Sequence, residues 1–121
     1  MDQTLLEMKR GDSHEWEFAV KKADGAVQPI TGASLRWTAK SRVDDLDAAA
    51  VLTATTANGK AVITDGAGGL CEVRLVPADT DTLSVPLTLL WDLQVRDASG
   101  NVRTVAEGKL LISADVSRTV P

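Results

Sequence analysis

The sequence contains few of the side chains on which catalysis, metal binding and disulfide bonding depend. Among its 121 residues there are one cysteine, one histidine and no tyrosine, and aromatic residues make up 3% of the chain. A single cysteine excludes a disulfide within the chain, so nothing marks an oxidised secreted scaffold. The chain also lacks a P-loop, a dinucleotide-binding glycine motif and the ligand spacing of a zinc site. We therefore expect no enzymatic activity and no cofactor.

Long apolar runs and excess positive charge are absent as well. Leu5-Leu6 is followed at once by Glu7, Lys9 and Arg10, which makes this run too short for a signal peptide or a membrane span. Lysine and arginine number 13 against 17 acidic residues, a formal net charge of −4. Nucleic-acid-binding proteins normally show the opposite sign or a basic stripe. We therefore expect neither nucleic acid nor a membrane as a partner.

The length and composition predict one folded domain that covers residues 1–121. Hydrophobic residues make up 44% and charged residues 25%, which is ordinary for a soluble globular protein. A disordered chain would have fewer apolar residues and more net charge. The length lies within the usual range of a single domain.

Apolar and polar residues alternate over several short stretches, as half-buried strands require. Residues 14–21, 35–40 and 70–76 show this pattern, and the last of these places Cys71 on an apolar face. The longest apolar series on one face runs from Leu87 to Val95, and we expect it to be the central strand. Residues 4–10 predict a weaker edge strand.

The turn residues predict how some of these strands are connected. Asn58-Gly59 is the strongest short hairpin signal, and it predicts that residues 51–56 pair with residues 61–64. Residues 101–116 form the last strand, where the alternation is blurred around Gly108. A bulge at that glycine would account for the blur.

Strand and turn signals of this kind predict an all-β fold. Only residues 77–83 suit a short helical turn, with a proline early and acids near the amino end. Seven or eight strands at a spacing of roughly 8–12 residues are typical of a β-sandwich or barrel. We expect a sandwich, because Pro86 and Gly108 indicate edges and bends rather than a closed barrel.

Two groups of residues have side chains suited to a catalytic or metal-binding site. Cys71 and His14 are the residues of a conceivable Cys-His nucleophilic pair, but a buried core cysteine is the more common use. The acidic stretches 44–47 and 79–81 carry oxygen ligands of the type that calcium prefers, yet neither matches an EF-hand loop. We expect both stretches to be solvated loops.

An integrin-type tripeptide and the tryptophan residues suggest binding sites, but each is better explained by a structural role. Arg10-Gly11-Asp12 spells an integrin-recognition tripeptide, but its position between two strand patterns predicts a turn. Trp16, Trp37 and Trp91 all fall on apolar strand faces, where core packing is expected. A carbohydrate-binding module would instead expose one or more of these rings.

The order of several strand and turn motifs resembles a known family. The motifs are Met8 to Ser13, Trp16 to Val20, Asp24-Gly25, Pro29 to Ala33 with Leu35, Leu90 to Val95, and Asp97 to Thr104. In this order they resemble the small immunoglobulin-like β-sandwich domains of tailed-phage virions and prophages. The amino-terminal domain of siphophage upper-baseplate proteins is one such domain.

This resemblance implies a single immunoglobulin-like β-sandwich of about seven to eight antiparallel strands. It further implies a non-enzymatic structural protein of a phage or prophage particle, acting as a tail or baseplate adaptor. The upper-baseplate proteins carry a long carboxy-terminal extension, whereas this chain ends at Pro121, which favours an adaptor or decoration piece. The alternatives are a capsid decoration protein, a carbohydrate-binding module, and a minimal metal-dependent or cysteine enzyme.

Under this interpretation the partners are other virion proteins of the tail, baseplate or capsid. The protein would reside in the virion, and in the host cytoplasm during assembly, as a monomer or a homo-oligomeric ring. An open sandwich docks through its edge strands, for which we expect residues 4–10 and the carboxy-terminal strand through Val116. The candidate docking residues are Leu5, Leu6, Leu111, Val116 and Val120.

Overall fold

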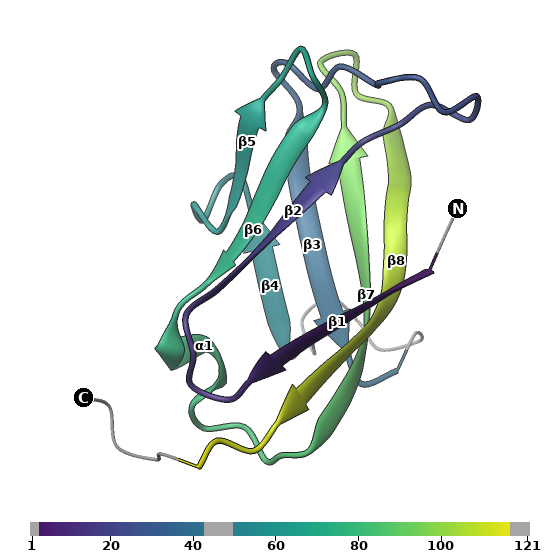
Figure 1. Ribbon diagram of the computed structural model, residues 1–121. Coiled ribbons are helices and arrows are strands. Elements are labelled where there is room, and N and C mark those ends of the chain that lie inside the picture. The colour runs from purple at the N-terminus through teal and green to yellow at the C-terminus, as the bar shows by residue number, and fades with distance from the viewer. Residues whose placement is uncertain (1–2, 43–49, 117–121) are drawn as a thin grey trace.

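The computed structural model describes residues 3–42 and 50–116. The chain forms β1 (Gln3–Lys9), β2 (His14–Ala19), β3 (Ser34–Lys40), β4 (Leu52–Thr55), β5 (Ala61–Asp65), β6 (Leu70–Leu75), α1 (Pro77–Thr80), β7 (Leu87–Arg96) and β8 (Val102–Ser113). Figure 1 shows these elements along the chain.

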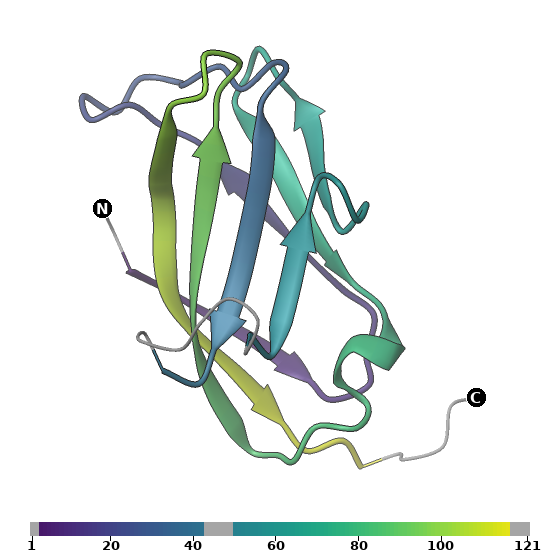
Figure 2. The same ribbon diagram turned by 180° about the vertical axis from the view of Figure 1, so that it is seen from behind.

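The strands form two sheets that pack face to face. One sheet has five strands in the order β1-β8-β7-β3-β4, and the other has three in the order β2-β6-β5. Figure 2 shows β8, β7, β3 and β4 of the larger sheet in front, with β1 and the smaller sheet behind them. The expected all-β sandwich of about eight strands is thus confirmed. The helical turn expected within residues 77–83 is also present, as α1.

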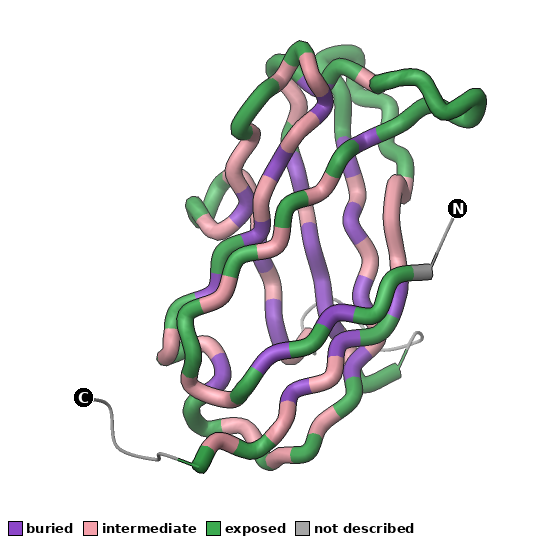
Figure 3. Tube along the Cα trace, viewed as in Figure 1, coloured by how far each residue is buried: buried purple, intermediate pink, exposed green. Residues whose placement is uncertain are grey.

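The core lies between the sheets and is built on alternate residues of each strand. Figure 3 shows buried positions alternating with exposed or intermediate ones along most strands. On β7 the inward side chains of Leu89, Trp91, Leu93 and Val95 are buried, and Leu87 is partly buried against the same core. Because β7 is the middle strand of the five-stranded sheet, the prediction of a central strand from Leu87 to Val95 is confirmed.

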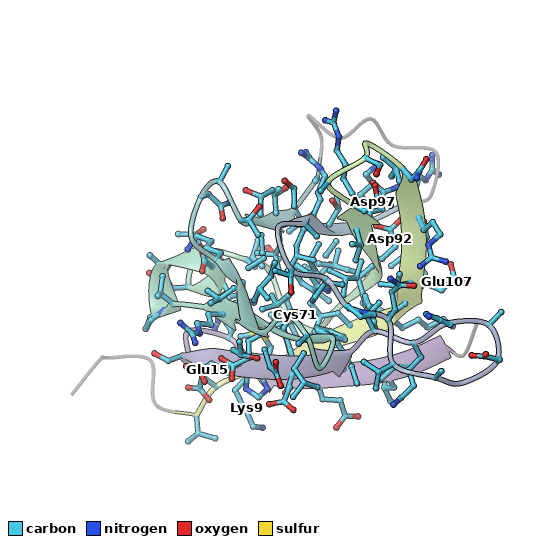
Figure 4. All side chains as sticks on the ribbon, turned by 90° about the horizontal axis from the view of Figure 1, so that it is seen from above. Lys9, Glu15, Cys71, Asp92, Asp97 and Glu107 are labelled. Atoms are coloured by element: carbon cyan, nitrogen blue, oxygen red, sulfur yellow. The ribbon has the colours of Figure 1, made fainter. Side chains whose placement is uncertain are left out.

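The position of β1 differs in part from the expectation. It lies at the edge of its sheet, as predicted, but it pairs with β8 in parallel rather than antiparallel. The second half of β8 pairs with β7 on one side and with β1 on the other, and Figure 4 shows β8 curving toward β1. As a consequence β8 lies between β1 and β7, so the prediction that the carboxy-terminal strand is an edge is wrong.

The predicted hairpin around Asn58-Gly59 is also wrong. The strand before the turn, β4, pairs with β3, whereas the strand after it, β5, pairs with β6 in the other sheet. The turn therefore carries the chain from one sheet to the other. Local turn chemistry favours a reversal of direction, but it does not specify which sheet receives the returning strand.

The irregularity in β8 lies at Val105, not at Gly108. Leu93 of β7 is opposite Ala106, while Gln94 is opposite Thr104, so Val105 is the extra residue of the bulge. Gly108 instead allows β1 to approach closely, because a Cβ atom there would overlap the backbone carbonyl oxygen of Thr4.

This close approach makes Gly108→Ala a direct test of the pairing between β1 and β8. The added methyl group can be accommodated only if the Thr4 backbone moves, so we expect a loss of about 1–3 kcal/mol in unfolding free energy, as for other overpacked positions. Denaturant melts measure this loss. Lys109→Ala alters the adjacent exposed side chain and should change stability by less than about 0.5 kcal/mol. Equal stability of the two variants would contradict the close packing of β1 on β8.

Candidate docking surface

The two residues considered as a nucleophilic pair lie far apart. On the antiparallel β2–β6 pair, His14 is opposite Leu75, whereas Cys71 is opposite Phe18. Four residues of strand separate the two positions, which is roughly 13 Å at the usual rise per residue. His14 instead contacts the ring of Trp16, with 4.6 Å between ring centroids. The structure therefore does not bring Cys71 and His14 together.

Cys71 is in the environment of a core residue, as expected from the sequence. Its side chain is fully buried, and Figure 4 shows it among the side chains between the sheets. Burial raises the pKa of the Cys71 thiol to about 11, and the negative charges of Glu17 and Glu72 contribute further. Both effects disfavour the thiolate, which is the reactive form.

We therefore expect native Cys71 to react slowly with a thiol reagent near pH 8 and quickly after unfolding. The unfolded thiol ionises near its ordinary pKa of 9.0, below the folded value. Proton linkage should therefore lower the folding stability as the pH rises from about 9 to 11. Labelling with and without denaturant, together with melts across this range, measures both effects. Fast native labelling near pH 8 would contradict the buried position.

Of the two acidic stretches, the structure describes only 79–81, and its Asp79 side chain has a structural role. The Asp79 carboxylate accepts hydrogen bonds from the Val76 backbone N–H at 2.7 Å and the Lys60 ammonium group at 3.0 Å. It therefore stabilises the start of α1. The stretch 44–47 lies outside the described residues. Among the described residues, no three histidine, cysteine or acidic side chains cluster as metal ligands.

The Arg10-Gly11-Asp12 tripeptide forms a structural turn, as predicted. The Arg10 guanidinium group pairs with Asp115 at 2.9 Å and donates to the carbonyl oxygen of Leu83 at 3.0 Å. The Gly11 N–H donates to the hydroxyl of the buried Thr80 at 2.8 Å. These contacts hold the β1–β2 turn against α1, the α1–β7 connection and the segment after β8.

The tryptophan side chains pack in the core rather than on a flat exposed surface. Trp37 and Trp91 are buried, and their ring centroids lie 6.4 Å apart. Trp16 is half-buried and contacts Trp37 at 5.8 Å. Phe18 packs against Trp91 at 5.4 Å. This arrangement supports the prediction of core packing and offers little to a sugar ring.

The predicted docking residues fall into different environments. Leu5 is 60% exposed and Val116 is 97% exposed, and Leu111 is half-buried. Leu6 is only 7% exposed, because it faces inward on β1 and packs in the core. Leu6 is therefore not available to a partner, which corrects that part of the prediction. Val120 lies outside the described residues.

The structure brings Leu5 and Leu111 together on one face. On the outer side of the sheet, Leu5 is opposite Lys109, and Lys109 is opposite Leu90. Leu111 is the next outward residue along β8, opposite Glu7 of β1. We refer to Leu5, Glu7, Leu90, Lys109 and Leu111 as the outer patch. It combines apolar side chains from three adjacent strands with one charge of each sign.

Leu90 was not predicted from the sequence, although a signal for it exists. It lies between Leu89 and Trp91, both of which face the core. Leu90 is thus an apolar residue out of phase with the alternation of β7. Leu111 lies in the same way between Leu110 and Ile112, which are buried. An apolar residue on the polar side of an alternating strand marks a possible contact surface.

Charged residues adjoin the outer patch. Asp92 of β7 is directly opposite Glu107 of β8 on the same outer face, and Figure 4 shows Glu107 at the periphery beside β8. One row along the sheet, Lys40 is opposite Leu90, which is in turn opposite Lys109. An acidic pair therefore lies next to a row that contains two lysines and Leu90. Such a rim favours partners of complementary charge pattern.

Comparison with known proteins returns no family and no curated protein that matches the chain. Within the described part of the chain, no helix has the length and apolar character needed to cross a membrane.

Proposed function

We propose that this chain is a non-enzymatic structural protein of a tailed phage or prophage particle. In this role it is a tail or baseplate adaptor that binds neighbouring virion proteins through the outer patch and the free edge of β1. The family assignment is supported by the order of the strand and turn motifs, beginning with Met8 to Ser13 and ending with Asp97 to Thr104. The sandwich with β1 at an edge fits such a domain.

The observation that carries the proposal is the exposure of Leu5 on an edge strand. Its side chain is 60% exposed and is next to Lys109, with Leu111 on the adjacent strand β8 and Leu90 on β7 beyond it. Apolar side chains gathered on a surface, with charges at the rim, are typical of a protein interface. The backbone of an edge strand can also pair with a strand of a partner.

The backbone on this edge is oriented toward such a partner. The Arg10 N–H donates to the carbonyl oxygen of Ser113, and this bond shows which residues of β1 turn their backbone groups toward β8. We call this alternation the phase of the ladder. In that phase the backbone groups of Leu6 and Met8 turn toward β8, whereas those of Leu5 and Glu7 turn to the free edge. The free edge and the outer patch therefore share Leu5 and Glu7, so one partner strand contacts both.

Substitution of Leu5 tests this function. Leu5→Asp places a charge in the outer patch, and binding to the correct virion protein should weaken about tenfold or more, as expected for a central interface residue. Because Leu5 is exposed, folding stability should change by less than about 0.5 kcal/mol. The measurement is a binding titration against the purified tail, baseplate and capsid proteins encoded beside this chain.

Thr64→Asp provides the matched control. Thr64 is exposed on β5 of the smaller sheet, so the same charge is added far from the outer patch in the fold. We expect this variant to bind normally. Binding to a capsid protein alone would indicate a decoration role instead of a tail role. Failure to bind any of these proteins, or absence of the protein from purified particles by mass spectrometry, would contradict the proposal.

A further inference from the structure

The five-stranded sheet has a second edge, β4, which is four residues long. A free strand edge presents backbone N–H and C=O groups that another chain can pair with. Unless such an edge is blocked, it invites association between copies. Both edges of this sheet, β1 and β4, can therefore pair with a strand of another chain unless they are blocked.

The hydrogen bonds to β3 show which groups of β4 face the free edge. The Thr56 N–H donates to the carbonyl oxygen of Leu35. Since the bonding pattern of an antiparallel pair alternates along the strand, the backbone groups of Leu52 and Ala54 also turn toward β3. Those of Thr53 and Thr55 turn outward, to the side where a further strand would lie.

The side chain of Asn58 occupies that side. Its amide nitrogen Nδ2 donates to the carbonyl oxygen of Thr53 at 3.2 Å. Its oxygen Oδ1 accepts the Thr55 backbone N–H at 2.9 Å. A primary amide carries both an N–H donor and a C=O acceptor, as a peptide group does. The Asn58 amide therefore makes the two bonds that one residue of a neighbouring strand would make.

The turn after β4 holds this amide in place. Oδ1 also accepts the Lys60 backbone N–H at 2.9 Å, and the Asn58 N–H donates to the Thr55 hydroxyl at 3.0 Å. Gly59 follows with φ of 78°, a left-handed conformation that glycine adopts without steric cost. The Asn58-Gly59 sequence thus places a side chain on the edge of β4 instead of forming a hairpin.

We propose that Asn58 is an edge-blocking residue, which closes β4 against pairing with the β4 strand of a second copy of this chain. The contrast with β1 supports this assignment. Among the described side chains, none is hydrogen-bonded to the outward backbone groups of Leu5 or Glu7. Within residues 3–42 and 50–116, a side chain therefore caps the edge at β4 but not the edge at β1.

Two substitutions separate the parts of this proposal. Asn58→Ala removes both edge bonds and exposes the edge, so it should form dimers as the concentration rises. Asn58→Asp keeps an acceptor for the Thr55 N–H but places a carboxylate oxygen near the Thr53 carbonyl. Because two such charges would face each other across a paired edge, this variant should remain monomeric. Sedimentation velocity over a range of concentrations measures the association.

Amide hydrogen exchange, read by NMR at Thr55, tests the blocking contact itself. In the unaltered protein the Thr55 N–H should be protected although it lies on a free edge. In Asn58→Ala the Thr55 N–H should exchange about tenfold faster. This factor corresponds to the loss of a hydrogen bond that contributes about 1.4 kcal/mol. The exchange is measured at a concentration where the variant is monomeric. In Asn58→Asp the protection should be retained.

Asn101→Ala is the control. Asn101 donates to the carboxylate of Asp97 in the turn between β7 and β8. Its substitution therefore also removes a side-chain amide from a turn, but this turn does not lie on a free edge. It should leave both the Thr55 exchange and the monomeric state unchanged. An unprotected Thr55 amide in the unaltered protein would overturn the proposal. So would association of Asn58→Ala no stronger than that of Asn101→Ala.

Discussion

The architecture depends on the strict alternation of side chains along β7. Its inward side chains, among them Trp91 and Leu93, are buried between the sheets, whereas its outward side chains lie on the open face. A slip of one residue in either pairing of β7 would exchange these two faces. The same alternation therefore fixes the core and, through Leu90, one part of the outer patch.

The second determinant is the close approach of β1 to β8. Gly108 has no side chain, and the Thr4 backbone occupies the space that a Cβ would need. This contact allows β1 to lie parallel to β8 with Leu6 and Met8 turned into the core. The neighbouring side chains of Leu5 and Glu7 then point outward. A packing requirement on the inside thus positions the surface that we assign to docking.

Much of the fold follows from period-two patterning, because that pattern reports which face of a strand is buried. It correctly predicted the central strand, the core position of Cys71 and the packing of Trp91. It does not report which strands are neighbours. Asn58-Gly59 therefore predicted a hairpin where the chain changes sheets. Gly108 predicted a bulge because a glycine required for close approach and a glycine at a bulge look the same in sequence.

The candidate surface could be predicted only in part for the same reason. Leu5 and Leu111 stand out as apolar residues that one buried face does not need. Their proximity, however, arises from the parallel pairing of β1 with β8, which no local signal encodes. Leu6 was assigned to the surface because the phase of a short edge strand is weakly marked in sequence. The two edges differ through Asn58, which only the three-dimensional contacts show.

Hydrogen exchange of the protein inside purified particles, compared with the free protein, tests the central claim most directly. If β1 and the outer patch form the docking surface, backbone amides of residues 3–9 and 107–113 should exchange more slowly in the particle. Amides of β2 and β5, at the edges of the smaller sheet, should exchange at the same rate in both. Slower exchange confined to β2 and β5, or no difference anywhere, would contradict the account.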